Sequence, residues 1–308
     1  MLAASGTIVQ ARLNAELVQV THNPLEVSLL NLVLAGSIST VAVIAVPALR
    51  QSWQVMVAAV MGGELRPWQL AGGALGGYYI AIQGAATLAL GAAVFAVAVV
   101  AGQTSTALVV DRLGIGPMGR QDVTTRRLLA ALTAIAAVLV SVSERIGQFD
   151  TSLGTMLPVL MLALSAGVAS AFQQALSGRV SAVSGRAIVA AWVNFAVGAA
   201  LMSLLVGLLG TLHRPSISVL PLDQWWLFLG GVFGLVYIAT VAWVVRLVGV
   251  LVTTLLTLTG LLAGSLLLDL LVPTKGTDFS WQLIVAVVFT AGAVTLASLR
   301  SQRVNEPS

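Results

Sequence analysis

Apolar runs of about 20 residues alternate with short polar connections along the whole chain. Coiled as a helix, a run of this length crosses a hydrocarbon core of about 30 Å. The pattern therefore predicts ten transmembrane helices. Their residues are 1–18, 27–49, 68–89, 91–111, 128–144, 156–176, 187–211, 225–245, 249–271 and 282–299. Segment 51–63 is apolar but too short to span, so we expect an interfacial piece or a helix extension there.

The composition supports an all-α membrane protein. Hydrophobic residues make up 58% of the chain and charged residues only 8%, whereas soluble domains carry about 25% charged residues. The net charge of +4 comes from arginines dispersed between the apolar runs, which does not favour a nucleic-acid partner. The chain has no cysteine, so disulfides and thiol chemistry are excluded. His22 and His213 are too isolated to predict a metal site.

One glycine-rich phrase is written twice, as "GGALGGYYIA" at 72–81 and "GGVFGLVYIA" at 230–239. Eight identities share this offset of 158 residues: Trp68/Trp226, Gly72/Gly230, Gly73/Gly231, Gly76/Gly234, Tyr79/Tyr237, Gly91/Gly249, Gly102/Gly260 and Asp111/Asp269. Upstream the offset becomes 163, pairing Gln10 with Gln173 and Asn31 with Asn194. We interpret the chain as a duplication, with repeats at 1–150 and 151–308.

The number of helices in each repeat predicts how the repeats are oriented. Five is an odd number, so the second half must enter the membrane from the opposite side to the first. Two inverted halves related by a pseudo-two-fold axis are common among secondary transporters. The expected fold is therefore ten transmembrane helices arranged as two inverted five-helix repeats.

The positive charges predict which side faces the cytoplasm. Eleven of the 15 arginines and lysines fall on one side of the expected topology, and the positive-inside rule makes that side, with both termini, cytoplasmic. The eleven are Arg50, Arg66, Arg112, Arg120, Arg126, Arg127, Arg179, Arg186, Arg246, Arg300 and Arg303. The other four are Arg12, Arg145, Arg214 and Lys275.

The first helix is expected to be short. Aligning Gln10 with Gln173 places the start equivalent to Met156 about seven residues before Met1. Either the start codon was assigned too late or a short first helix is tolerated, and we favour the first. The positive segment that begins a signal peptide is missing.

Several segments resemble the YdcZ-like family of the drug/metabolite transporter superfamily: "VQARLNAEL" (9–17), "GGALGGYY" (72–79), "VVAGQTSTALVVDRLG" (99–114), "FQQALSGRV" (172–180), "WVNFAVG" (192–198) and "TGLLAGSLLLD" (259–269). The resemblance implies a bacterial inner-membrane exporter in which two five-helix units are fused. Two positions depart from the family's pattern. Ser177 stands where asparagine is usual, and Leu261 stands where glutamine is usual, whereas the first half keeps that glutamine as Gln103.

Polar residues within the apolar runs are candidates for a solute path, because amides and phenols facing lipid are costly. The alternative is that they hold helices together, at roughly 0.6 kcal/mol each. The paired glycines likewise either allow close helix packing or line a path. The candidate path near the membrane midplane consists of Asn31, Tyr79, Gln83, Gln103, Asn194 and Tyr237.

Two classes of function remain. The first is a secondary transporter, an inner-membrane exporter of a small solute that works by alternating access between the halves. The second is a non-transporting membrane scaffold or a lipid-translocating protein. No nucleotide-binding loop, catalytic triad or metal spacing is present in the sequence, so we expect no enzyme activity, cofactor or bound metal. The expected partners are membrane lipid and a small molecule, for a monomer or a homodimer. No carboxylate lies mid-span, so the energy source is left open.

Overall fold

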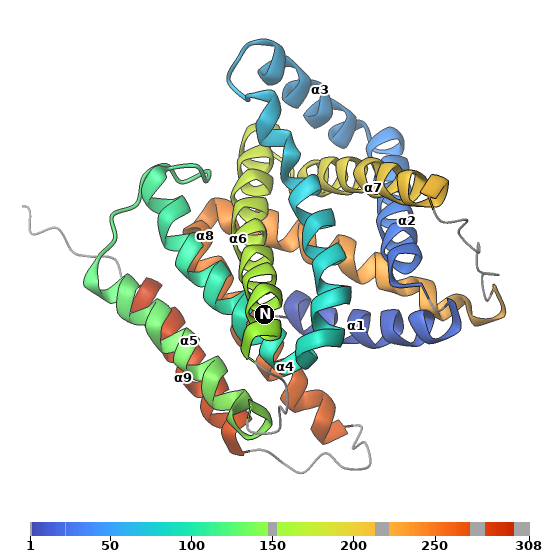
Figure 1. Cartoon of the computed structure of the whole chain (residues 1–308). Helices are drawn as coiled ribbons and strands as arrows, with labels where there is room; N and C mark the ends of the chain where they lie inside the picture. Colours follow the sequence, from blue (N-terminus) through green and yellow to red (C-terminus); the bar gives the residue numbers. More distant parts are fainter. Residues whose placement is uncertain (1, 22, 147–152, 213–221, 272–280, 299–308) are drawn as a thin grey trace, which may run out of the picture.

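A computed structural model describes residues 2–21, 23–146, 153–212, 222–271 and 281–298. His22, His213, Arg214, Lys275, Arg300 and Arg303 lie outside these ranges. Across the described ranges the chain is helical and has no strand (Figure 1). The α-helices are α1 (Leu2–Thr21), α2 (Pro24–Ala45), α3 (Pro47–Met61), α4 (Gly72–Leu113), α5 (Thr125–Ile146), α6 (Leu153–Ser184), α7 (Ala187–Leu212), α8 (Leu229–Leu271) and α9 (Trp281–Ser298). Two 3₁₀ helices, η1 (Pro67–Ala71) and η2 (Leu222–Phe228), lead into α4 and α8.

The first correction concerns the end of the second expected span. Helix α2 ends at Ala45 rather than at residue 49, because Val46 is extended (φ −98°, ψ 112°) and Pro47 begins a new helix. A residue before proline is pushed out of the helical region. The short apolar segment thus belongs to a separate helix, α3. Trp53 packs edge-on against Trp192 of α7, with ring centroids 4.5 Å apart.

Helices α4 and α8 each contain two of the expected spans. A straight helix of 42 residues, the length of α4, would be about 63 Å long, twice the thickness of a hydrocarbon core. Figure 1 shows the ribbon of α4 bending between two arms. In α8 the interruption lies at Gly249, where φ is +83° and ψ is 175°. The expected boundary between 245 and 249 is therefore a break in the backbone, whereas α4 is one helical element across its expected boundary near residue 90.

Five described helices are long and apolar enough to cross a membrane, and they belong to α2, α4, α6, α7 and α8. The longest of these apolar stretches covers 42 residues, Asp223–Gly264, and includes η2 and most of α8. An all-α membrane fold fits these helices. Helix α1 has 20 residues, and its equivalent in the second repeat, α6, has 32.

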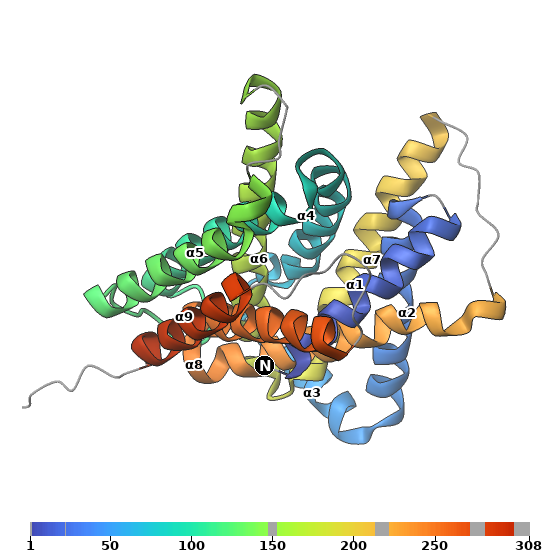
Figure 2. The same ribbon diagram turned by 90° about the horizontal axis from the view of Figure 1, so that it is seen from below.

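The two halves pack against each other reciprocally. Helix α4 of the first half lies along α6 of the second, and the equivalent pair is α8 of the second half with α1 of the first. The remaining main contacts join equivalent helices, α2 with α7 and α5 with α9. Figures 1 and 2 both show α5 and α9 side by side along one flank. Each half is therefore packed chiefly against the other.

Small residues allow the closest of these contacts. A Cβ on Gly167 of α6 would lie 2.1 Å from the carbonyl oxygen of Val99, and one on Gly102 of α4 would lie 2.2 Å from the carbonyl oxygen of Leu164. Any larger residue would push α4 and α6 apart. Such glycines let helix backbones touch in lipid, where packing replaces the hydrophobic drive.

Candidate functional site

Polar side chains of α6 and α7 meet the glycine-rich start of α4. Gln173 donates to Asn194 Oδ1 (3.1 Å), and Asn194 donates in turn to Ser177 Oγ (2.7 Å). These three residues form the second-half amide cluster. A Cβ on Gly73 would lie 2.0 Å from the Asn194 carbonyl oxygen, and one on Gly76 would lie 2.4 Å from Gln173 Nε2. The absence of side chains on α4 thus makes room for the cluster.

The equivalent arrangement occurs where α1 and α2 meet the start of α8. Asn31 donates to Asn14 Oδ1 (2.9 Å), and with Gln10 these residues form the first-half amide cluster. A Cβ on Gly230 would lie 2.5 Å from Asn14 Oδ1, and one on Gly234 would lie 3.0 Å from Gln10 Nε2. The duplicated glycine phrase therefore has one purpose in both halves, to receive the amides of the opposite half.

The equivalent tyrosines of the two phrases influence each other electrostatically. The side chains of Tyr79 and Tyr237 are close enough to interact electrostatically. Tyr79 also packs near the ring of Phe95, at a centroid distance of 6.3 Å, and Tyr237 interacts with the hydroxyl of Thr257. Of the six candidate residues, these two come from opposite halves and lie within electrostatic range of each other.

The other candidates are placed separately. Asn31 and Asn194 each belong to an amide cluster, where their side-chain amides bond to neighbouring helices. Gln103 is buried at 9% exposure, and its backbone nitrogen lies against Gly167 of α6. Gln83 is exposed on the surface of α4, so the structure does not bring it to the others.

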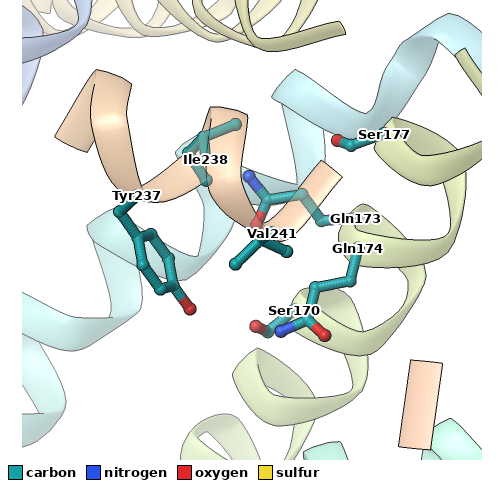
Figure 3. A pocket seen from close by; sticks show the side chains of 7 residues that line it. All are labelled: Ser170, Gln173, Gln174, Ser177, Tyr237, Ile238 and Val241. Carbon is teal, nitrogen blue, oxygen red and sulfur yellow. The ribbon is translucent and has the colours of Figure 1, made fainter. Parts of the chain in front are cut away.

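A small polar cavity lies between α6 and α8, beside Tyr237 (Figure 3). Its volume is about 20 Å³, and a buried site needs roughly 10–15 Å³ to hold one water molecule. Ser170, Gln173, Gln174 and Ser177 of α6 line one wall, and Tyr237, Ile238 and Val241 of α8 line the other. Ser170 and Gln174 are not among the residues expected above. The signal that would have found them is the spacing of polar residues on one face of α6.

A buried carboxylate joins the end of α4 to the break in α8. Asp111 is 3% exposed and pairs with Arg127 of α5. Its two oxygens accept the backbone N–H groups of Val250 (3.0 Å) and Leu251 (3.1 Å). These N–H groups begin a helix directly after Gly249, and such groups have no partner within their own helix. Asp111 therefore caps the second arm of α8 and stabilises the break.

A second hollow lies between α2 and α7. It is an open groove of about 400 Å³ lined by Val33, Gly36, Ser37, Thr40, Val41, Ala196 and Ala199. Thr40 accepts a hydrogen bond from Trp192 Nε1 (2.7 Å). The lining carries two hydroxyls and no charged side chain. Within the ranges that the structure describes, no three histidine, aspartate or glutamate side chains gather where a metal ion would bind.

Comparison with known proteins agrees with the two-unit organisation. A family model described as "Putative inner membrane exporter, YdcZ" matches residues 1–140 and again residues 158–296. No curated protein matches the chain. A solved structure titled "Crystal structure of protein" aligns with a TM-score of 0.66 at 21% identity, covering 96% of this chain and 95% of that one. That likeness concerns the fold alone. The resemblance in the sequence is thus confirmed, and the chain belongs to the YdcZ family of inner-membrane exporters, of which it carries two units.

Proposed function

We propose that the protein is a secondary transporter that exports a small solute across the inner membrane by alternating access between two inverted halves. The observation that carries the proposal is the reciprocal contact of the halves, in which the glycines of each receive the amides of the other. In inverted-repeat transporters, substrate binds near the midplane at the interface of the repeats, and one repeat rocks against the other.

The proposed solute path passes between Tyr79 and Tyr237, with Gln103 as a further polar group. These residues come from the two halves, and the polar cavity opens beside Tyr237. Asn31 and Asn194 do not line the proposed path. Their hydrogen bonds stabilise the two amide clusters, which pack against the glycine-rich starts of α8 and α4. Gln83 enters the path only if α4 turns during the cycle, because its side chain is exposed in this state.

The proposed orientation has both termini in the cytoplasm. The uneven distribution of arginine and lysine supports it. The ends of α4 and α6 then face the cytoplasm, and the connection between α7 and α8 faces the periplasm.

Lipid translocation is less well supported. The open groove between α2 and α7 is the one feature that suits it. A lipid headgroup crossing the membrane needs charged or strongly polar partners, and the groove offers only Ser37 and Thr40. Export of a small solute fits the buried polar groups better.

An untargeted comparison of small molecules in cells with and without the gene tests the proposal. We expect at least one solute to accumulate in cells that lack the protein. Gln103→Leu should reproduce that accumulation while the protein stays folded, because Leu261 already occupies the equivalent position in the second half. The matched control is Ser105→Leu, which changes an exposed residue of the same helix and should leave export intact. Unchanged solute levels in all strains would overturn the proposed export.

A further inference from the structure

Helix α6 carries a continuous polar stripe, which consists of Ser170, Gln173, Gln174, Ser177, Ser181 and Ser184. The spacing of three or four residues places these side chains on one face of the helix. Four of them, Gln174, Ser177, Ser181 and Ser184, are at most 4% exposed. The stripe begins at the cavity and ends where the helix ends.

Gln174 is a member of the stripe whose hydrogen bonds are incomplete. Its Oε1 accepts from Thr254 Oγ1 at 3.2 Å, whereas its Nε2 has no partner among the described residues. Turning the amide over would exchange the two ends and still leave one of them unpaired. Figure 3 shows the Gln174 amide and the Ser170 hydroxyl on α6, with the Tyr237 hydroxyl directed towards them from α8. A buried amide left in this way bears its full desolvation penalty.

Ser181 repeats the pattern one helical turn beyond Ser177. It is fully buried, and its Oγ has no partner among the described residues. Two members of the stripe, one on either side of Ser177, thus carry a polar group that has no hydrogen-bond partner among the described residues. Native interiors rarely keep such groups without another reason.

The first half shows that the fold does not require them. With the offset of 163 residues, Gln173 corresponds to Gln10 and Ser177 to Asn14, which are both polar. Gln174 corresponds to Ala11, and Ser181 corresponds to Val18. The hydrogen-bonded positions therefore stay polar in both halves, whereas the two unpaired positions are polar only in α6.

The chemistry of the cavity restricts the ligand. Its lining has amides, hydroxyls and aliphatic groups, and apart from the phenol of Tyr237 it contains no ionisable side chain. A charged ligand there would lose its hydration without gaining an opposite charge. An uncharged ligand with a carbonyl, ether or hydroxyl oxygen would instead accept a hydrogen bond from Gln174 Nε2.

We propose that Gln174 binds the exported solute, a small uncharged molecule with a hydrogen-bond acceptor, and that the α6 stripe lines its route to the end of α6 at Ser184. The inference rests on the proposed function, because it names the solute class and the route for the same cavity. It also makes the second half the binding half, since α1 lacks both unpaired groups.

The route is closed in this structure. A Cβ on Gly178 would lie 2.5 Å from Val245 Cγ1 and 3.2 Å from Pro117 Cδ, so α8 and the connection after α4 cover the stripe beyond Ser177. Arg246 of α8 also donates to the Gly185 carbonyl oxygen (3.2 Å). Opening therefore requires α8 to move away from the end of α6.

Cysteine labelling tests the route without knowledge of the solute, because the chain has no cysteine of its own. Ser181→Cys would be compared with Ala175→Cys, a position of α6 that is equally buried at 0%. The probe is a water-soluble methanethiosulfonate reagent applied to inside-out vesicles. If the open state is populated at a few per cent, Ser181→Cys should react on the order of tenfold faster than Ala175→Cys. Equal, negligible labelling of both variants would overturn the route, whether or not the protein exports a solute.

Substitution tests the binding residue. Gln174→Ala gives α6 the alanine that the first half has at the equivalent position. We expect export to fall to background while the melting temperature is unchanged or higher. Gln173→Ala is the contrasting variant, because it removes the donor to Asn194 and should lower the melting temperature. Wild-type export by Gln174→Ala would overturn the binding role. Absence of export by the wild-type protein would instead contradict the proposed function. The labelling of Ser181→Cys would still show whether the route opens.

Discussion

The two amide clusters are the same design built twice from slightly different residues. In the first-half cluster the acceptor for the asparagine amide is Asn14, and in the second-half cluster it is Ser177. Both clusters face a glycine helix from the opposite half. The amide hydrogen bonds and glycine contacts that both halves share hold the two halves together. We call this set of contacts the joint, and both halves need it equally.

The halves differ where the joint is not involved. Gln174 and Ser181 have apolar equivalents in α1, and Gln103 has the apolar equivalent Leu261. The amide–glycine contacts that both halves share thus explain how the halves pack together, and polar groups that only one half has join the tyrosine pair as candidates for transport. Substitutions in the joint should therefore lower stability, by amounts that depend on how closely each contact is packed.

Removing the carboxylate of Asp111 should have the largest effect on stability. Asp111→Ala leaves Arg127 without its partner and uncaps the N–H groups of Val250 and Leu251. Breaking a buried ion pair from one side costs about 3–5 kcal/mol. We expect a large fall in melting temperature in detergent. Asp122→Ala is the control, because Asp122 is exposed in the connection between α4 and α5, and an equal fall in both variants would contradict the cap.

The contact between α4 and α7 should be the next most sensitive. Gly73→Ala would place a methyl group 2.0 Å from the Asn194 carbonyl oxygen, so the two backbones must separate. Overpacking of this kind costs about 1–3 kcal/mol. Gly77→Ala should be tolerated, because its nearest neighbour would be 3.8 Å away. Thermal unfolding of the two variants measures the difference.

The equivalent glycine in the other half sharpens the comparison. A Cβ on Gly231 would lie 3.1 Å from the Asn31 carbonyl oxygen, more than 1 Å farther than in the case of Gly73. Gly231→Ala should therefore destabilise less than Gly73→Ala, although the sequence presents the two glycines as equivalent. Equal destabilisation would show that tolerance of alanine follows the equivalent position in the repeat and not the local distance to the neighbouring backbone.

The repeat could be predicted from the sequence, because identities at a constant offset need no coordinates to be recognised. The offset also placed glycines and amides at equivalent positions. It could not show that Gly73 of one half meets Asn194 of the other, because contact partners depend on how the helices pack. The break at Gly249 depends on a positive φ and on a cap from a residue 139 positions earlier, and neither is visible in a local pattern.

The candidate path stays a prediction, and the structure separates its residues in a way that the sequence did not show. Tyr79 and Tyr237 stand at equivalent positions and lie within electrostatic range of each other, whereas Gln83 is exposed on α4. Gln174 was not among the predicted residues, although its neighbour Gln173 was recognised as part of the repeat. A search for residues common to both halves finds the joint and misses polar groups that only one half has.

The smallest expected effect comes from the hydrogen bonds inside the clusters. Asn14→Ala and Ser177→Ala each remove the acceptor for an asparagine amide of the same half, and such bonds within membrane proteins average about 0.6 kcal/mol. We expect small, similar losses of stability in both variants. Ser177→Asn, which writes the first-half residue into α6, should be close to neutral, because Gly72 leaves room beside it as Gly230 does beside Asn14. A severe loss in that variant would show that the two clusters are not interchangeable.

If the same packing unit serves both halves in opposite membrane orientations, single cysteines placed before the two glycine-rich helices must face opposite sides of the membrane. Glu64 and Asp223 are exposed and lie four and three residues before the equivalent tryptophans Trp68 and Trp226. A membrane-impermeant maleimide would be applied to intact spheroplasts and to inside-out vesicles carrying Glu64→Cys or Asp223→Cys. With inverted halves and both termini in the cytoplasm, we expect Asp223→Cys to be labelled only in spheroplasts and Glu64→Cys only in inside-out vesicles. Labelling of both cysteines from the same side would contradict the opposite orientations.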